Sequence, residues 1–301
     1  MAAVLERPPV IVRPTGAALG ADIDGVNLGQ DLSPETVAAI KQVWSDRLVL
    51  RFRGQHLDDD QLMRFSALFG ELDFAPVIAA SRVKIRGEDR YVESAGEGHR
   101  YISIISNIVE NGVAIGALGA YEAIWHTDMS YNPEPPIGSA LYALEVPPSG
   151  GDTGFANMYM AYDTLPEELR RRVESLLCRH DSSRNSAGEL RRGYTDATDP
   201  REAPGEDHPI IRTHPVTGRK ALFLGRRRNA YIQGLDLDES ERLLDALWEH
   251  ATKPQLTWYQ QWRVGDLVLW DNRCVMHRRD EFDPMSRRLM HRSQIKGDRP
   301  F

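Results

Sequence analysis

A histidine and an aspartate stand two positions apart in the segment AIWHTDMSYNPEPP, residues 123–136, as His126 and Asp128. Side chains at i and i+2 of a β-strand point to the same face, so this pair could present an imidazole nitrogen and a carboxylate oxygen to one metal ion. Two neighbouring ligands rarely hold an ion alone, and a third is needed. The strongest candidate among the nine histidines is His277, which follows a strand-like run in VLWDNRCVMHRRDEF.

Two histidines and one carboxylate on one side of an ion, with the other positions open, are the ligands of non-haem Fe(II) oxygenases. The spacing of His126 and Asp128 also arises by chance, and His291 is a second-rank candidate ligand. A zinc hydrolase could use the same three residues with one open position. A catalytically silent binding protein on a cupin-like barrel is a third possibility, although such a protein typically lacks one of the ligands.

Two arginines near the end of the chain, Arg288 and Arg292, lie in the strand-like run RRLMHRSQI, where even spacing puts both on one face. Buried guanidinium groups are stable only when anions pair with them. One is expected to hold a dicarboxylate cosubstrate and the other an acidic substrate. The alternative is a pair of solvated charges. The run Arg226, Arg227 and Arg228 is expected to be a solvated cluster rather than a second anion site.

The segment PPSGGDTGFANM contains two consecutive glycines followed by Asp152 and Thr153. Glycines allow another group to approach the backbone closely, and the Thr153 hydroxyl could donate to the same carboxylate as Arg288. A zinc hydrolase would have no use for such a pair.

The charge balance, 37 Lys and Arg against 44 Asp and Glu with a net charge of -7, lacks the basic footprint of nucleic-acid binders. The two cysteines, Cys178 and Cys274, lack the spacing of a zinc knuckle or redox motif and are expected to be buried thiols in a reducing compartment. No apolar run reaches the length of a membrane span. We therefore expect a cytoplasmic protein without nucleic-acid or membrane partners.

Helical periodicity and capping residues predict four helices, at 33–46, 58–70, 160–177 and 236–252. Strand-like runs near the N-terminus and through the second half predict many short strands. The region 74–122 and the polar stretch 182–209 are expected to be surface loops, the latter as a lid or a partly disordered segment. The whole chain, 1–301, is expected to form one α+β domain in which helices surround a sandwich or barrel of short strands.

Four motifs in order resemble the taurine dioxygenase and 2,4-dichlorophenoxyacetate dioxygenase family of Fe(II)- and 2-oxoglutarate-dependent enzymes. They are WHTDMSY (125–131), PPSGGDTGF (147–155), GDLVLWDNRCVMH (265–277) and RRLMHRSQIKGDRP (287–300). The stretches GADIDGVNL and FSALFGEL (65–72) are similar to the N-terminal half of the same family, so the resemblance covers nearly the whole chain.

The resemblance implies a double-stranded β-helix (jelly-roll) core with helices packed on the outside. It implies that His126, Asp128 and His277 bind Fe(II), that Arg288 and Thr153 bind the distal carboxylate of 2-oxoglutarate, and that Arg292 faces the anionic group of the substrate. O2 is the other cosubstrate, and hydroxylation releases succinate and CO2. Hydroxylation beside a heteroatom would cleave the carbon–heteroatom bond. Related halogenases carry a small residue in place of the carboxylate ligand, so Asp128 indicates oxygenation.

The substrate implied is a small organic acid, with a carboxylate such as an aryloxyalkanoate preferred over a sulfonate. Taurine enzymes bind the sulfonate with a histidine after the second helix, and FAPVIAASRVKI has none at that place. Asn107, Met129 and Tyr131, beside the metal motif or in the preceding loop, are expected to shape the pocket. Members of the family are commonly dimers or tetramers, so a homo-oligomer is expected.

Overall fold

The computed structural model describes residues 10–75, 82–85, 88–91, 100–120, 123–191 and 193–301. Its centre is a nine-stranded sheet in the order β1-β2-β3-β20-β12-β22-β7-β10, in which β4 also pairs with β22. The strands are β1 (Ile11–Pro14), β2 (Ala21–Asp24), β3 (Val49–Phe52), β4 (Leu72–Asp73), β7 (Ile102–Ser106), β10 (Ala117–Leu118), β12 (Gly138–Glu145), β20 (Leu267–Asp271) and β22 (Leu289–Ile295). The β2–β3 and β7–β10 pairs are parallel and the other pairs antiparallel. Strands from both ends of the chain therefore lie side by side.

A second sheet of four strands, in the order β11-β21-β13-β19, packs against the larger one. Its strands are β11 (Ala123–His126), β13 (Thr153–Asn157), β19 (Thr257–Gln260) and β21 (Val275–Arg279). The rings of Phe155 and Trp270 meet across the two sheets at 5.7 Å between centroids, and one core cluster contains buried residues of both. The core between the sheets is thus a layer of interdigitated side chains, as in sheet sandwiches.

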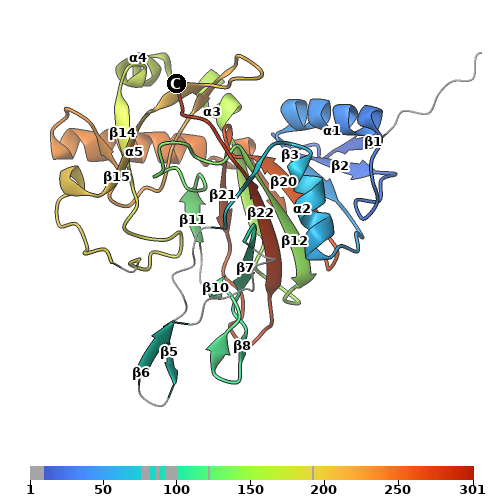
Figure 1. Cartoon of the computed structure of the whole chain (residues 1–301). Helices are drawn as coiled ribbons and strands as arrows, with labels where there is room; N and C mark the ends of the chain where they lie inside the picture. Colours follow the sequence, from blue (N-terminus) through green and yellow to red (C-terminus); the bar gives the residue numbers. More distant parts are fainter. Residues whose placement is uncertain (1–9, 76–81, 86–87, 92–99, 121–122, 192) are drawn as a thin grey trace, which may run out of the picture.

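The helices lie outside the sheets, with α1 (Pro34–Arg47) and α2 (Asp59–Ala67) on the side of β1–β3 and the others on the opposite side (Figure 1). Ser33 caps α1 by accepting from the Thr36 backbone, and Pro34 occupies the first turn, as the sequence predicts. Asp58 and Gln61 form a reciprocal capping box at the start of α2, which ends at Ala67, three residues earlier than expected. The predicted helix at 236–252 is α5 (Leu237–Ala251), with Leu244 and Leu247 in the core.

The single helix predicted for 160–177 is wrong. The chain forms α3 (Met158–Asp163) and α4 (Glu167–Val173) instead. Pro166 stands at the N-cap of α4, and a proline disfavours helical backbone in the residue before it. The pattern of apolar residues continues across this break, which explains the error.

The expectation of loops over 74–122 is wrong for β7, which pairs with β22 along its length and is largely buried. Short pairs also form between β5 (Arg82–Ile85) and β6 (Glu88–Tyr91), and between β8 (Val109–Glu110) and β9 (Val113–Ala114). The rest of the expectation lies partly outside the described residues. The strand pattern is hard to recognise in the sequence because β7 is short and lies between polar segments rich in glycines and charged residues.

The polar stretch 182–209 is packed onto the body of the protein. It joins β14 (Leu177–Asp181) to β15 (Gly205–Pro209), which pair with each other, and it includes the short helix η2 (Pro200–Glu202). Ser182, Ser183 and Ser186 are buried. The remaining elements are β16 (Ile211–Thr213), β17 (Lys220–Leu222), β18 (Tyr231–Ile232) and η3 (Pro254–Leu256).

Among the residues described, none of the helices combines the length and the apolar character that crossing a membrane requires.

Phe52 is fully buried on β3, where its ring meets that of Phe65 edge-to-face at 5.4 Å. We expect Phe52→Ala to lower the free energy of unfolding by about 3–5 kcal/mol, because it removes buried surface and leaves a cavity. Phe301→Ala is the matched control, because that side chain is 64% exposed, and it should change the value by less than about 0.5 kcal/mol. Urea unfolding followed by circular dichroism measures both, and equal losses would contradict the assigned core.

Candidate active site

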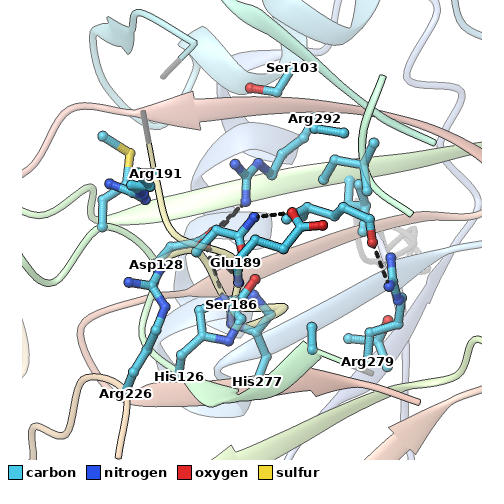
Figure 2. Close-up of a pocket in the computed structure, with 18 of the residues that line it drawn as sticks. Ser103, His126, Asp128, Ser186, Glu189, Arg191, Arg226, His277, Arg279 and Arg292 are labelled. Carbon is cyan, nitrogen blue, oxygen red and sulfur yellow. Dashed lines mark hydrogen bonds and ion pairs between the residues drawn. The ribbon is translucent and has the colours of Figure 1, made fainter. Parts of the chain in front are cut away.

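A cavity of about 540 Å³ lies between the two sheets, within the usual size range of small-molecule sites. Its walls come from β7, β12, β20 and β22 of the larger sheet, from β11, β13 and β21 of the smaller sheet, and from the segment 185–194. Figure 2 shows His126, Asp128 and His277 between Arg191 and Arg226 on one side and Arg279 on the other. The cavity therefore places titratable groups from distant parts of the sequence around one space.

His126, Asp128 and His277 lie together at the cavity wall, and their ligand atoms are all within 4.8 Å of one another. His126 and His277 are register partners on β11 and β21, with ring centroids 4.2 Å apart. Asp128 Oδ1 is 3.6 Å from His126 Nε2 and 3.8 Å from His277 Nε2. The sequence therefore identified three residues that the fold brings to one point.

The expectation that His126 and Asp128 share a strand is wrong, because β11 ends at His126. Asp128 lies in the following turn, where Asn272 holds it. The Asp128 backbone N–H donates to Asn272 Oδ1 at 2.9 Å, and Asn272 Nδ2 donates to the Asp128 carbonyl at 3.0 Å. Met129 follows with a φ of 48°, a left-handed conformation that turns the chain away.

The two oxygens of Asp128 have different surroundings. Ser139 Oγ donates to Oδ2 at 3.2 Å and Gln294 Nε2 lies 3.4 Å from the same atom. Arg292 Nη1 donates to Oδ2 at 2.9 Å and to Oδ1 at 3.1 Å. Oδ2 thus carries most of the supporting hydrogen bonds, and Oδ1 is the oxygen near both histidines.

The protonation states of the three residues suit metal binding. Burial acts to raise the pKa of Asp128, but the charge of Arg292 and the interactions with His277 and His126 outweigh it and hold that pKa well below its usual range. Burial, with His126 nearby, lowers the pKa of His277 to about 3. His126 Nδ1 lies 2.7 Å from the Ile124 carbonyl, which can only accept, so Nδ1 carries a proton and Nε2 is the nitrogen that can offer a lone pair to a metal.

This donor set, one carboxylate and two imidazoles, fits a divalent transition metal. All three residues are at least 92% buried, and polar groups are costly to bury unless they have partners, so a cation shared by the three ligand atoms would stabilise the cluster.

A buried cationic group occupies the far end of the cavity. Arg288 is 2% exposed, and burial together with nearby Arg279 lowers its pKa to about 9. Its Nε has no hydrogen-bond partner, and none of the described carboxylates pairs with this guanidinium. Thr153 Oγ1 accepts from Trp262 Nε1 at 2.9 Å, so its own hydroxyl hydrogen is free to donate. Arg288 and Thr153 therefore both line the cavity with donors to offer.

The residues expected to contact a substrate are only partly at the cavity. Met129, Tyr131 and Arg292 line it, and the guanidinium of Arg292 is bonded to Asp128. Asn107 is not among the residues that line the cavity, and its role in shaping the pocket stays a prediction. Its side-chain amide instead donates to the carbonyls of Pro284 and Ser286 and accepts from the backbone N–H of Arg288, so it fixes the loop before β22.

Several cavity residues escaped the sequence analysis. The expectation of a solvated cluster at 226–228 is wrong for Arg226, which is 7% exposed and lines the cavity. Arg191, from the polar stretch, lines it as well. The sequence could have indicated Arg279 as a cavity residue, because it stands two residues after His277 on β21 and its side chain therefore lies on the same face. Nothing in their spacing would have linked Asn272 or Ser139 to Asp128.

A second group of possible metal ligands, His214, Asp271 and Cys274, lies in the core. Arg273 donates to both oxygens of Asp271, and His214 Nε2 lies 3.1 Å from Oδ2 of the same carboxylate. His214 Nδ1 accepts from two backbone N–H groups. These side chains satisfy one another, and the group is a structural network.

The chain matches the model of the Taurine catabolism dioxygenase TauD, TfdA family over residues 11–294. It is 36% identical over 296 residues to the (S)-phenoxypropionate/alpha-ketoglutarate-dioxygenase of Sphingobium herbicidovorans, with 97% of this chain and 96% of that protein covered. It is 35% identical over 280 residues to the alpha-ketoglutarate-dependent 2,4-dichlorophenoxyacetate dioxygenase of a Burkholderia strain, with 92% and 91% covered.

Among solved structures, the chain is similar to AAD-2 in complex with Mn(II) and N-oxalylglycine. The TM-score is 0.75 and the identity 30%, over 97% of this chain and 98% of that one. The match confirms the resemblance that the four motifs indicated. The chain belongs to the taurine dioxygenase and 2,4-dichlorophenoxyacetate dioxygenase family, whose members are α-ketoglutarate-dependent oxidoreductases that use Fe(II) and O2.

Proposed function

We propose that the protein hydroxylates a small organic acid, consuming O2 and 2-oxoglutarate and releasing succinate and CO2. One observation carries the proposal. A buried cluster of two histidines and an aspartate faces the same cavity as an arginine with no acidic partner among the described residues. A metal site and an anion site in one enclosed space are what a metal-dependent reaction of a 2-oxo acid needs.

In this proposal His126 Nε2, Asp128 Oδ1 and His277 Nε2 hold Fe(II), which when bound supplies the activation of O2 for attack on a C–H bond. The protein keeps the ligands in place. Arg292 and Ser139 fix the aspartate, and the Ile124 carbonyl fixes the tautomer of His126. The rings of Trp270 and Phe155 lie 4.8 and 6.2 Å from that of His277 and exclude water from its side of the cavity.

The distal carboxylate of 2-oxoglutarate would bind Arg288, whose planar guanidinium suits a carboxylate, with the Thr153 hydroxyl as second donor. Asn107 contributes by fixing the backbone at Arg288. A buried guanidinium without an anionic partner is energetically unfavourable. An anion that pairs with Arg288 removes this cost and therefore binds more tightly.

The substrate favoured is a carboxylate such as an aryloxyalkanoate, whose hydroxylation beside the ether oxygen would cleave the C–O bond. The names of the two relatives above support this class, and the apolar lining by Ile104, Leu141 and Leu190 suits an aromatic body. A sulfonate substrate is the alternative within the family. A zinc hydrolase is not supported, because it leaves Arg288 and Thr153 without a role.

The proposal extends to the whole chain. We propose that the two packed sheets are a double-stranded β-helix (jelly-roll) core and that 1–301 is a single domain, since the larger sheet joins strands from both ends. We also propose a dimer or tetramer, as the family resemblance implies. A cytoplasmic location is supported by two free, buried cysteines.

Turnover tests the function directly. Protein supplied with Fe(II), 2-oxoglutarate and O2 is expected to release succinate in step with product from phenoxyacetates or phenoxypropionates, and more slowly or not at all from taurine. Chromatographic measurement of succinate and product checks both. Product formed with Zn(II) and without 2-oxoglutarate would instead establish a hydrolase.

Removing a ligand tests the metal site without turnover. His277→Ala should lower the affinity for Mn(II) by at least about 100-fold, because loss of an outer-sphere partner alone costs about 10–100-fold. The control is His56→Ala, which removes an exposed histidine outside the cluster and should bind Mn(II) normally. Calorimetric titration measures both, and unchanged binding by His277→Ala would exclude it as a ligand.

Two adjacent arginines give a matched test of the cosubstrate site. With Mn(II) bound, Arg288→Gln should weaken N-oxalylglycine binding by about 30-fold or more, because truncating one partner of a buried charged pair has at least that effect. Arg287→Gln should leave it unchanged, since Arg287 is half-exposed and pairs with Glu145 and Glu110. If both variants bind the probe like the wild type, Arg288 does not hold the cosubstrate.

A further inference from the structure

Arg226 follows a closely packed stretch of backbone beside the metal cluster. The Leu224 carbonyl accepts from Thr127 Oγ1 at 2.8 Å, which ties this stretch to the turn between His126 and Asp128. Gly225 packs so closely that an added Cβ would lie 2.4 Å from His180 Nδ1 and 2.9 Å from Ser130 Oγ. The guanidinium that follows is buried and points into the cavity (Figure 2).

The charge of Arg226 has no acidic partner among the described residues, and its Nε has no hydrogen-bond partner. The two acids whose fields reach it, Asp128 and Asp181, are engaged elsewhere. Arg292 bonds Asp128, while Ser183 and Asn229 donate to Asp181.

The next two arginines in the chain are different. Arg227 pairs with Glu241 and Asp245, and Arg228 lies 3.6 Å from Asp196. Arg226, which faces the cavity, is therefore the arginine of this run that has no ion-pair partner among the described residues.

A second guanidinium lies beside the first. Arg191 and Arg226 approach the ring of Tyr131 with their Cζ atoms 4.0 and 5.2 Å from its centroid, and Arg191 also donates to the Tyr131 hydroxyl. Burial lowers the pKa of Arg226, and repulsion from Arg191 adds to that effect. Two like charges in a water-poor space are unfavourable unless an anion joins them.

We propose that Arg226 and Arg191 form the site for the substrate's acid group, a carboxylate or another oxyanion, on the opposite side of the metal cluster from Arg288. The proposal rests on the proposed function and deepens it. Arg292 is bonded to Asp128, whereas Arg226 and Arg191 have no acidic partner among the described residues. The apolar body of the substrate lies against Met129, Leu190 and Tyr194, which line the same cavity. A bound substrate also holds Leu190 and Arg191 against the cavity.

The test measures binding, not turnover. Protein loaded with Mn(II) and N-oxalylglycine is titrated calorimetrically with phenoxyacetate, phenylacetate and hexanoate, with the amide of each, and with phenylmethanesulfonate. We expect at least one acid to bind more tightly than its amide. Arg226→Gln should weaken the binding of that acid by about 30-fold or more and leave the amide unchanged, because only the acid pairs with the guanidinium. Arg191→Gln should have a smaller effect in the same direction. The sulfonate shows whether the site prefers one oxyanion.

Arg228→Gln is the matched control and should bind every probe like the wild type, since its half-exposed side chain points away toward Asp196. Arg226→Gln should be at least as stable to heat as the wild type, because it removes a buried charge that has no partner. If it does not fold, Arg226→Lys keeps the charge without the planar fork and should weaken acid binding by about tenfold.

The outcomes separate the two proposals. Failure of N-oxalylglycine to bind the wild type would remove the proposed function. Binding of N-oxalylglycine, with acids bound no better than amides or with Arg226→Gln binding acids normally, would overturn the acid site alone.

Discussion

The buried negative charge of Asp128 is the constraint on which the rest of the site depends. A carboxylate between two apolar sheets is stable only if it is hydrogen-bonded and paired. Here the groups that satisfy the carboxylate come from Ser139 on β12 and from Arg292 and Gln294 on β22, while Asn272 after β20 holds the backbone of Asp128. These elements are up to 155 residues apart along the chain, as the Gln294–Ser139 contact shows. The carboxylate can therefore be ionised in place only after the larger sheet has assembled, and the histidines reach it only when the smaller sheet packs on top.

The cavity has an excess of positive charge. Among the described residues that line it, five are arginines and two, Asp128 and Glu189, are acidic, of which Glu189 is exposed. In a space shielded from water these charges interact more strongly than on the surface. Such a cavity is costly to keep empty and favours anions over neutral molecules of the same shape. The same property contributes to the low pKa of His277, because burial and nearby cations disfavour protonation of its ring.

The features that sequence alone predicted are those with a local signal. The caps of α1 and α2 are formed by residues within three positions of each helix start. His126, Asp128, His277, Thr153 and Arg288 were found because their types and order match a family pattern. The contacts that the sequence did not predict involve distant partners. Asp128 owes its position to Asn272, 144 residues away, and Asn107 accepts a hydrogen bond from the backbone of Arg288. The sequence did not predict that Arg226 is buried, because a run of three adjacent arginines suggests an exposed segment and does not indicate which of the three is buried.

The spacing of the arginines on β22 limits what each can do. Arg288 and Arg292 are four residues apart, and extended backbone advances about 3.3 Å per residue, so their backbones are about 13 Å apart. Their side chains therefore start from well-separated points of the strand. Arg288 faces the end of the cavity near Thr153, while the charge of Arg292 is taken up by the metal-binding carboxylate. A reaction that joins a dicarboxylate and an acidic substrate at one metal therefore needs another cation beyond Asp128, and Arg226 with Arg191 is the pair of buried or partly buried guanidinium groups that the fold places there.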